Sequence, residues 1–320
     1  MSTPELSVNR SALPLVKKLC NNAEMYCVDV KKTEQGTTLI DAGIKSKGGF
    51  LAGQIITEIC LGGFGSAEIF HKRYGDIEVP SVSVYTDHPA VATLGSQFGG
   101  WQINLEDFGA IGSGPARALA LKPKEIYAKI DYKDKADVTT LVLETNKEPP
   151  ESVITHIYSQ CNVTPDNLFL ILTPTTTVTG STQISGRIVE TGIHKLTRLG
   201  LDPKSIMHAW GYAPIAPVHP KFAKAMGRTN DAILYAGVAY YTVHYDDEKL
   251  NKLVSKASSS TSKNYGKPFF EIFKGVDYDF RRIDPDLFAP AVLIINNATT
   301  GNTFKAGQIN LEVFRQSVGL

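Results

Sequence analysis

The 320-residue chain has few cysteines, little excess charge and no long apolar run, and each shortage excludes a class of protein. Only Cys20 and Cys27 of its four cysteines are near neighbours, and their spacing fits neither CxxC redox chemistry nor a usual zinc site. Lysine and arginine (33) balance aspartate and glutamate (32), so composition points neither to nucleic acid nor to a membrane surface as a partner. We find no signal-peptide core and no transmembrane run, and we expect a cytoplasmic protein with reduced thiols.

The familiar catalytic motifs are missing as well. The seven histidines form no HxH, HExxH or HxxxH pattern, and the chain has no GxSxG elbow and no paired CxxC. The sequence therefore predicts no metal site and gives little support to a serine hydrolase.

Runs rich in β-branched residues alternate with helical patterns, which indicates an α/β chain with mixed sheets. We expect strands at 37–43, 81–86, 139–145, 168–173 and 291–297. We expect helices at 8–28, 51–61, 115–121, 183–199, 221–226 and 246–258. No long linker divides residues 1–320, so we treat them as one functional unit.

Two short similarities suggest an internal duplication. The stretch "LAGQIITE" (51–58) resembles "ISGRIVET" (184–191), and "HPAVATLGSQ" from His88 resembles "HPKFAKAMGRTN" from His219. Both matches have nearly the same offset. They predict like-folded halves at roughly 37–145 and 167–297, with the active-site cleft between them.

Arg187 and Glu190 lie three residues apart in "QISGRIVETGIHKL" (183–196), in a helix that we expect to begin near Ser181 or Thr182. One interpretation is an exposed ion pair, worth roughly 0.2–0.5 kcal/mol. The other follows from position, because a strand–loop–helix start often borders a site in α/β proteins. In that case Glu190 is a general base that Arg187 keeps ionised.

Two further loops have a structural and a functional interpretation. Gly112, Ser113 and Gly114 precede Pro115 in "GSGPARALALKPK" (112–124), either as a tight turn or as an anion site at a helix start. In "MGRTNDAILYAG" (226–237), residues 229–231 either cap a helix or belong to a binding site together with Arg228.

Together these segments resemble the methenyltetrahydromethanopterin cyclohydrolase family. The matching stretches run in family order: "DHPAVATLGSQFGGWQI" (87–103), "GSGPARALALKPK" (112–124), "QISGRIVETGIHKL" (183–196), "MGRTNDAILYAG" (226–237), "YGKPFFEIF" (265–273) and "YDFRRIDPDLFAPA" (278–291). They cover nearly the whole chain.

The resemblance implies a hydrolase of one-carbon metabolism, as in methanogenesis, that needs no cofactor and no metal. It would interconvert N5,N10-methenyltetrahydromethanopterin plus water with N5-formyltetrahydromethanopterin, so that the pterin is its substrate. It also implies two domains with a deep pocket between them, and a homotrimer. The family's catalytic R-x-x-E pair maps onto Arg187, which keeps the carboxylate ionised and oriented, and Glu190, the general base for water.

Substrate contacts follow from the other matched loops. Ser113 and Gly114 would supply a hydroxyl and an amide, Arg228 and Asn230 would contact polar edges, and Trp101 or Phe288 would pack on the ring system. Two alternatives stay open from the residues alone. One is a phosphate- or nucleotide-binding enzyme that uses the 112–117 loop, and the other is a non-catalytic pterin carrier.

Overall fold

A computed structural model describes residues 6–320, which form two compact units, each built on a six-stranded mixed sheet. The described part of Met1–Ser66 together with Val91–Gly180 makes unit 1, and Ala67–Ala90 together with Ser181–Leu320 makes unit 2. The expected α/β class is confirmed. Each unit contains segments of both expected halves, so the like-folded halves and the cleft between them stay predictions.

The sheet of unit 1 has the strand order β1-β2-β8-β7-β6-β5. Its strands are β1 (Asp29–Lys32), β2 (Thr38–Asp41), β5 (Trp101–Leu105), β6 (Phe108–Ser113), β7 (Thr139–Glu144) and β8 (Leu168–Leu172). The helices are α1 (Val8–Asn21), α2 (Ala23–Tyr26), α3 (Phe50–Cys60), α4 (Ala116–Ala120), α5 (Lys124–Ile130) and α6 (Glu151–Cys161), with a π-helical segment at Ala90–Gln97. α7 (Val178–Ser185) spans the point where the chain passes into unit 2.

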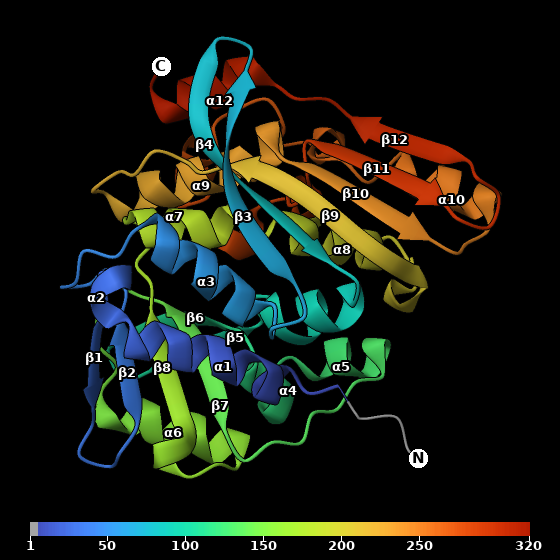
Figure 1. Ribbon diagram of the computed structural model, residues 1–320. Helices are drawn as coiled ribbons and strands as arrows, with labels where there is room; N and C mark the ends of the chain where they lie inside the picture. The colour runs from blue at the N-terminus through green and yellow to red at the C-terminus, as the bar shows by residue number, and fades with distance from the viewer. Residues whose placement is uncertain (1–5) are drawn as a thin grey trace, which may run out of the picture. The chain divides into compact units, whose positions relative to one another are not determined.

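Three parallel neighbours, β2, β8 and β7, form the centre of this sheet, and both of its faces are covered (Figure 1). Ile40 and Ile171 on one face pack with residues of α1 and α3. Leu39 and Leu170 on the other face pack with residues of α6. Because both faces of these strands are buried, their sequences are mostly apolar. This pattern allowed their positions to be predicted.

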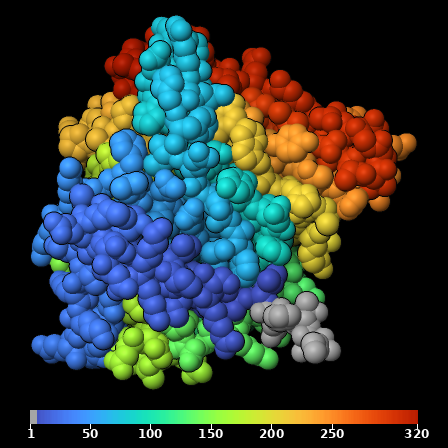
Figure 2. All heavy atoms as spheres, viewed as in Figure 1, coloured from blue at the N-terminus to red at the C-terminus, as the bar shows by residue number. Residues whose placement is uncertain are grey.

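Unit 2 contains the second sheet, with the strand order β12-β11-β10-β9-β4-β3. Its strands are β3 (Ser66–Tyr74), β4 (Ile77–Thr86), β9 (Ile206–Pro214), β10 (Val238–Val243), β11 (Val292–Asn297) and β12 (Thr303–Gly307). The helices are α8 (Ile188–Arg198), α9 (Phe222–Ala236), α10 (Asp247–Val254), α11 (Phe269–Gly275) and α12 (Leu311–Val318). Figure 2 shows atoms of the β3–β4 hairpin at the molecular surface, in light blue.

The two faces of β9 differ in their surroundings. Ala209 and Ala213 are buried, and α8 packs against β9 and β10. On the opposite face Tyr85 and Trp210 are cross-strand partners and are 49% and 41% exposed. This alternation is typical of an antiparallel sheet that is covered on one side.

The five expected strands are confirmed, but four helices differ from the prediction, among them the one expected at 246–258, which ends at Val254 as α10. The helix expected at 183–199 is divided into α7 and α8, so a start at Ser181 or Thr182 is wrong. The helix expected at 221–226 extends to Ala236 as α9. The helix expected at 8–28 ends at Asn21, and the short α2 follows it.

Within residues 6–320, no helix is both long and apolar enough to cross a membrane.

Candidate active site

Arg187 occupies the junction between α7 and α8 in unit 2. With φ −85° and ψ 7° it is the residue that precedes the first turn of α8, and its carbonyl accepts hydrogen bonds from the amide and the hydroxyl of Thr191. Glu190 is the third residue of α8, where the positive end of the helix dipole favours a carboxylate. The spacing of the pair is as predicted, although the helix begins later than expected.

The two side chains form an ion pair that is largely removed from solvent. Nε of Arg187 donates a 2.9 Å hydrogen bond to Oε2 of Glu190, and Nη2 lies 2.8 Å from the same oxygen. The Glu190 side chain is 4% exposed and that of Arg187 is 19% exposed, so the pair is buried rather than a surface ion pair. Among residues 6–320, no group donates a hydrogen bond to Oε1 of Glu190. One carboxylate oxygen is therefore held and the other is left unbonded.

Tyr241 of β10 lies directly beneath this turn of α8. Its hydroxyl donates a 2.9 Å hydrogen bond to the carbonyl of Val189. Complete burial, and secondarily the charge of Glu190, raises the pKa of Tyr241 well above its ordinary value, so the phenol stays a donor. Gly192, one turn further along, leaves the space that the Tyr241 hydroxyl occupies.

A second ion pair holds α8 farther along its length. Lys195 is 1% exposed, and its Nζ donates to Oδ1 of Asp286 at 2.8 Å and to the Asp286 carbonyl at 3.3 Å. The apolar side chains Ile188, Ile193 and Leu196 of this helix have no exposed surface. Helix α8 is thus fixed both by these side chains and by polar contacts.

Sequence reasoning selected neither Tyr241 nor Lys195. Tyr241 is one of the β-branched and aromatic residues of "VAYYTV" (238–243), and the only signal it gives is that of a strand. Lys195 follows His194 in the helical pattern, where a lysine is normally solvated. Both roles depend on contacts between residues far apart in the chain.

Three predicted substrate contacts lie in unit 1, in neighbouring strands and the loop after them. Trp101 is 3% exposed and belongs to the core beside α6, with its ring centroid 6.4 Å from that of His156. Ser113 is buried, and its hydroxyl lies 3.7 Å from Sγ of Cys60. Gly114 has φ +99°, and its amide donates to the Ser96 carbonyl. The amide that we expected to bind a ligand therefore already has a partner.

The other three lie in unit 2, and α9 carries two of them. Asn230 donates from Nδ2 to the carbonyl of Met226 in its own helix, and Arg228 donates only to backbone carbonyls. Phe288 packs edge-to-face on Phe269, with centroids 5.9 Å apart. Because α9 already begins at Phe222, the interpretation of residues 229–231 as helix caps is wrong.

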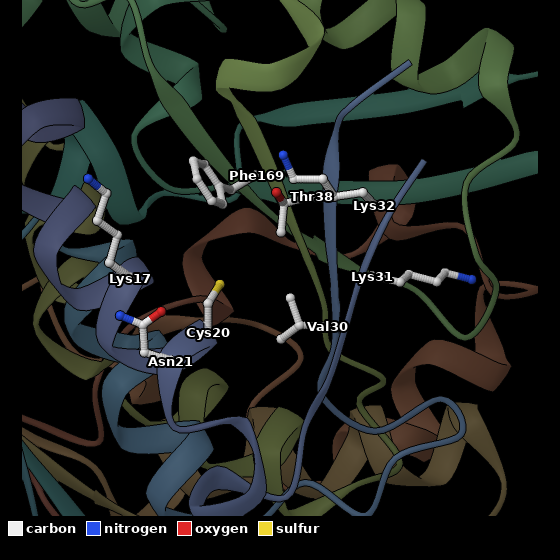
Figure 3. Close-up of a pocket in the computed structure, with 8 residues that line it drawn as sticks. All are labelled: Lys17, Cys20, Asn21, Val30, Lys31, Lys32, Thr38 and Phe169. Carbon is white, nitrogen blue, oxygen red and sulfur yellow. The ribbon is translucent and has the colours of Figure 1, made fainter. Parts of the chain in front are cut away.

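Unit 1 has a hollow of about 290 Å³ between α1 and the edge strand β1 (Figure 3). Lys17 and Lys32 line it, together with the ring of Phe169, while the side chain of Lys31 points away and pairs with Glu148.

No group of three or more residues able to hold a metal ion is found among residues 6–320.

An α/β chain with a buried carboxylate held by a guanidinium at a helix start has the features of an enzyme that uses acid–base chemistry. Comparisons with known proteins give the family. Residues 7–318 match the family model described as Cyclohydrolase (MCH). The chain belongs to this cyclohydrolase family.

Full-length relatives carry a more specific name. The methenyltetrahydromethanopterin cyclohydrolases of Methanothermobacter marburgensis and Methanocaldococcus jannaschii are each 44% identical to this chain. The alignments cover 98% of the chain and 100% and 98% of those proteins. The Methanococcoides burtonii protein of the same name is 41% identical, over 98% of this chain and 99% of its own length.

Proposed function

We propose that this protein is a methenyltetrahydromethanopterin cyclohydrolase, in which Glu190 is the general base and Arg187 holds it ionised and oriented. It adds water to the N5,N10-methenyl pterin and gives the N5-formyl pterin, as a step of one-carbon metabolism. Identity of 41–44% over the whole length of several relatives supports the reaction. The observation that carries the residue assignment is the buried Glu190, held through Oε2 and unbonded at Oε1.

The chemistry of the substrate suits a carboxylate. The methenyl carbon lies between two nitrogens that share a positive charge, so it attracts an anion and is open to attack by water. The unbonded Oε1 of Glu190 can accept a hydrogen bond from that water and remove its proton as the new C–O bond forms. A positioned general base contributes typically about 10²–10⁴-fold to a rate.

The remaining steps balance without another reactant. Attack by water and loss of one proton to Glu190 leave a neutral tetrahedral carbon that bears a hydroxyl group. The bond from this carbon to N10 then breaks, and N10 takes up the proton from Glu190. The hydroxyl loses its own proton as the formyl C=O forms on N5, so one water is consumed and one proton is released.

Arg187 has a supporting role in this scheme. A guanidinium that met the cationic substrate directly would repel it, whereas one that is bonded to Glu190 stabilises the ionised carboxylate. Its Nε and Nη2 lie 2.9 Å and 2.8 Å from Oε2, which holds that oxygen beside the guanidinium and leaves Oε1 as the oxygen available to water. This arrangement supports an orienting function.

We keep Ser113, Gly114, Asn230, Trp101 and Phe288 as proposed contacts to the pterin, and a homotrimer as the proposed assembly. The hydrogen bonds of Arg228 to backbone carbonyls favour a role outside the pterin site. The phosphate- or nucleotide-binding alternative has less support, because the Gly114 amide is bonded to Ser96 and α4 has five residues. A pterin carrier would need no Arg–Glu pair.

The change in absorbance on hydration of the methenyl substrate tests the assignment. Glu190→Gln should cut turnover by at least about 100-fold while the substrate still binds, because the amide cannot accept the proton. Glu248→Gln, which replaces an exposed glutamate in the first turn of α10, is the matched control and should retain full activity. Near-normal turnover of Glu190→Gln would falsify the proposed base.

A further inference from the structure

Unit 2 has a positively charged hollow of about 360 Å³ formed by segments that are distant in the sequence. His219, Lys224 and Arg228 enter it from the loop before α9 and from the first turns of that helix. Phe270 and Glu271 of α11 form another wall, and Gly319 follows α12 at the rim. None of these side chains belongs to the Arg187–Glu190 pair.

Three basic residues and one carboxylate, Glu271, line the hollow, so positive charge is in excess there. Among the described residues, neither His219, Lys224 nor Arg228 forms an ion pair within 4.0 Å. Desolvation, and then the charges of Arg228 and Lys224, lowers the pKa of His219 below its ordinary value. Unpaired like charges so close together destabilise one another, and a bound anion would relieve the repulsion.

Arg228 is fixed in position by backbone carbonyls. Its Nε donates to Ser317 (3.3 Å), and its Nη1 donates to Pro217 (3.3 Å) and Val218 (3.0 Å). Its Nη2 makes no hydrogen bond with any residue from 6 to 320, and it lies beside Gly319, where a Cβ would be 3.4 Å away. A rigid guanidinium thus keeps donors free for a ligand.

His219 is oriented in a similar way. Its Nδ1 accepts a 2.9 Å hydrogen bond from the amide of Lys221, so the neutral ring carries its proton on Nε2. The ammonium of Lys224 lies 5.7 Å from the centroid of the Phe270 ring. The hollow therefore combines fixed and mobile donors with an aromatic surface.

We propose that this hollow binds a phosphate group, either free or as the phosphate of a small organic ester. The phosphoryl oxygens contact Arg228 and Lys224, because a guanidinium and an ammonium are the usual phosphate-binding cations in proteins. The organic part of an ester packs on Phe270. Glu271, which also lines the hollow and whose Oε1 accepts a 3.4 Å hydrogen bond from Gln316, can accept a hydrogen bond from a hydroxyl of the ligand. This binding is separate from the hydration reaction.

His219 serves as an internal reporter for the test. The full-length protein, labelled at the histidine Cε1 carbons, is titrated by NMR in chloride, inorganic phosphate and phenyl phosphate, and His219→Gln identifies the signal. A bound phosphate should raise the midpoint of the His219 titration above its value in chloride, because the anion offsets the charges of Arg228 and Lys224. Binding constants follow from the same spectra.

Two neighbouring lysines give matched variants. Lys224→Met should weaken phosphate binding by about tenfold or more, whereas Lys221→Met, which removes an equal charge outside the hollow, should change it little. Tighter binding of phenyl phosphate assigns an ester as the ligand, and equal binding assigns free phosphate. An unchanged His219 midpoint in both anions, or equal weakening by the two variants, would overturn the proposal and leave Arg228 as a cap for α12.

Discussion

The hydroxyl of Tyr241 donates its hydrogen bond to the carbonyl of Val189, the residue immediately before Glu190. The donor belongs to β10 and the acceptor to the first turn of α8, so the bond fixes that turn against the sheet. Because Tyr241 is buried, it has few alternative positions. The hydrogen bond from Tyr241 therefore fixes the backbone next to Glu190, the proposed base.

Tyr241→Phe removes this hydrogen bond, while the Val189 carbonyl keeps its place in the backbone ladder of α8. We expect the free energy of unfolding to fall by about 0.5–1.5 kcal/mol, which is the usual net contribution of one hydrogen bond. We also expect kcat to fall more than KM changes, since the position of Glu190 becomes less defined. Denaturant unfolding and steady-state kinetics measure both effects.

Tyr240→Phe is the control for this change, because Tyr240 is the adjacent residue of the strand and is only partly buried. It should leave both stability and kcat close to their original values. If Tyr241→Phe loses stability but keeps its full kcat, the phenol supports the fold and has no part in positioning Glu190.

Gly192 is required by the same contact. A Cβ at this position would overlap the Tyr241 hydroxyl and would lie 3.0 Å from the ring carbon Cζ and 3.1 Å from Cγ of Pro290. Gly192→Ala should therefore destabilise the protein by about 1–3 kcal/mol through overpacking. Unfolding in urea measures the loss.

The double variant tests whether the hydroxyl is the cause. Gly192→Ala should cost less stability in a Tyr241→Phe background, because the oxygen that the methyl group meets is absent. The recovery should be partial, since Pro290 and the ring remain close. Strictly additive effects would show that the two residues do not interact.

Arg187→Lys tests whether the geometry of the guanidinium matters beyond its charge. Lysine keeps the positive charge but lacks the planar guanidinium, whose Nε donates to Oε2 and whose Nη2 lies 2.8 Å from the same oxygen. We expect kcat to fall by up to about 100-fold, because small errors in the position of a catalytic group are costly. Arg198→Lys is the control, because Arg198 is a partly exposed residue in the last turn of α8. It should have little effect on kcat. Equal rates for both variants would leave charge alone as the function of Arg187.

Much of the fold could be predicted from the sequence, because burial on both faces of a sheet leaves a plain pattern. β7 and β8 are such strands, and both lie where their apolar runs indicated. The contact between Arg187 and Glu190 can be predicted as well, because the two residues are three apart in one helical segment. Whether the pair was exposed could not be decided, because its burial depends on residues that are distant in the chain.

The break between α7 and α8 could not be predicted, because the spacing of apolar residues does not show where one helix ends and the next begins. Ser181 and Ser185 donate hydroxyl hydrogen bonds to the carbonyls of Ala216 and Pro214, which fixes α7 on the chain around the end of β9. These contacts join segments about thirty residues apart, so a helical pattern cannot reveal them. The charged hollow beside α9 was missed for the same reason.

Asp231 links three helices of unit 2 through a fully buried carboxyl group. It belongs to α9, accepts hydrogen bonds from the Phe269 amide at the start of α11, and accepts a 2.5 Å hydrogen bond from the Ser317 hydroxyl of α12. Burial raises the pKa of Asp231 from an ordinary value of 3.8 to about 8, although these hydrogen bonds act in the opposite direction. The folded protein therefore keeps a proton that the unfolded chain releases.

The sign of the resulting pH dependence follows from this difference. Between about pH 4 and pH 8 the folded state holds one more proton than the unfolded state at Asp231, so raising the pH across this range destabilises the fold. The slope should approach roughly 1.4 kcal/mol per pH unit. Asp231→Asn removes the titrating group and should flatten the dependence, which urea unfolding at pH 6 and pH 8 measures. Asp279→Asn is the control, because hydrogen bonds from Arg281 lower the pKa of that partly exposed carboxylate, so its contribution to stability changes with pH only in the acidic range. A slope that persists in Asp231→Asn would assign the proton to another group.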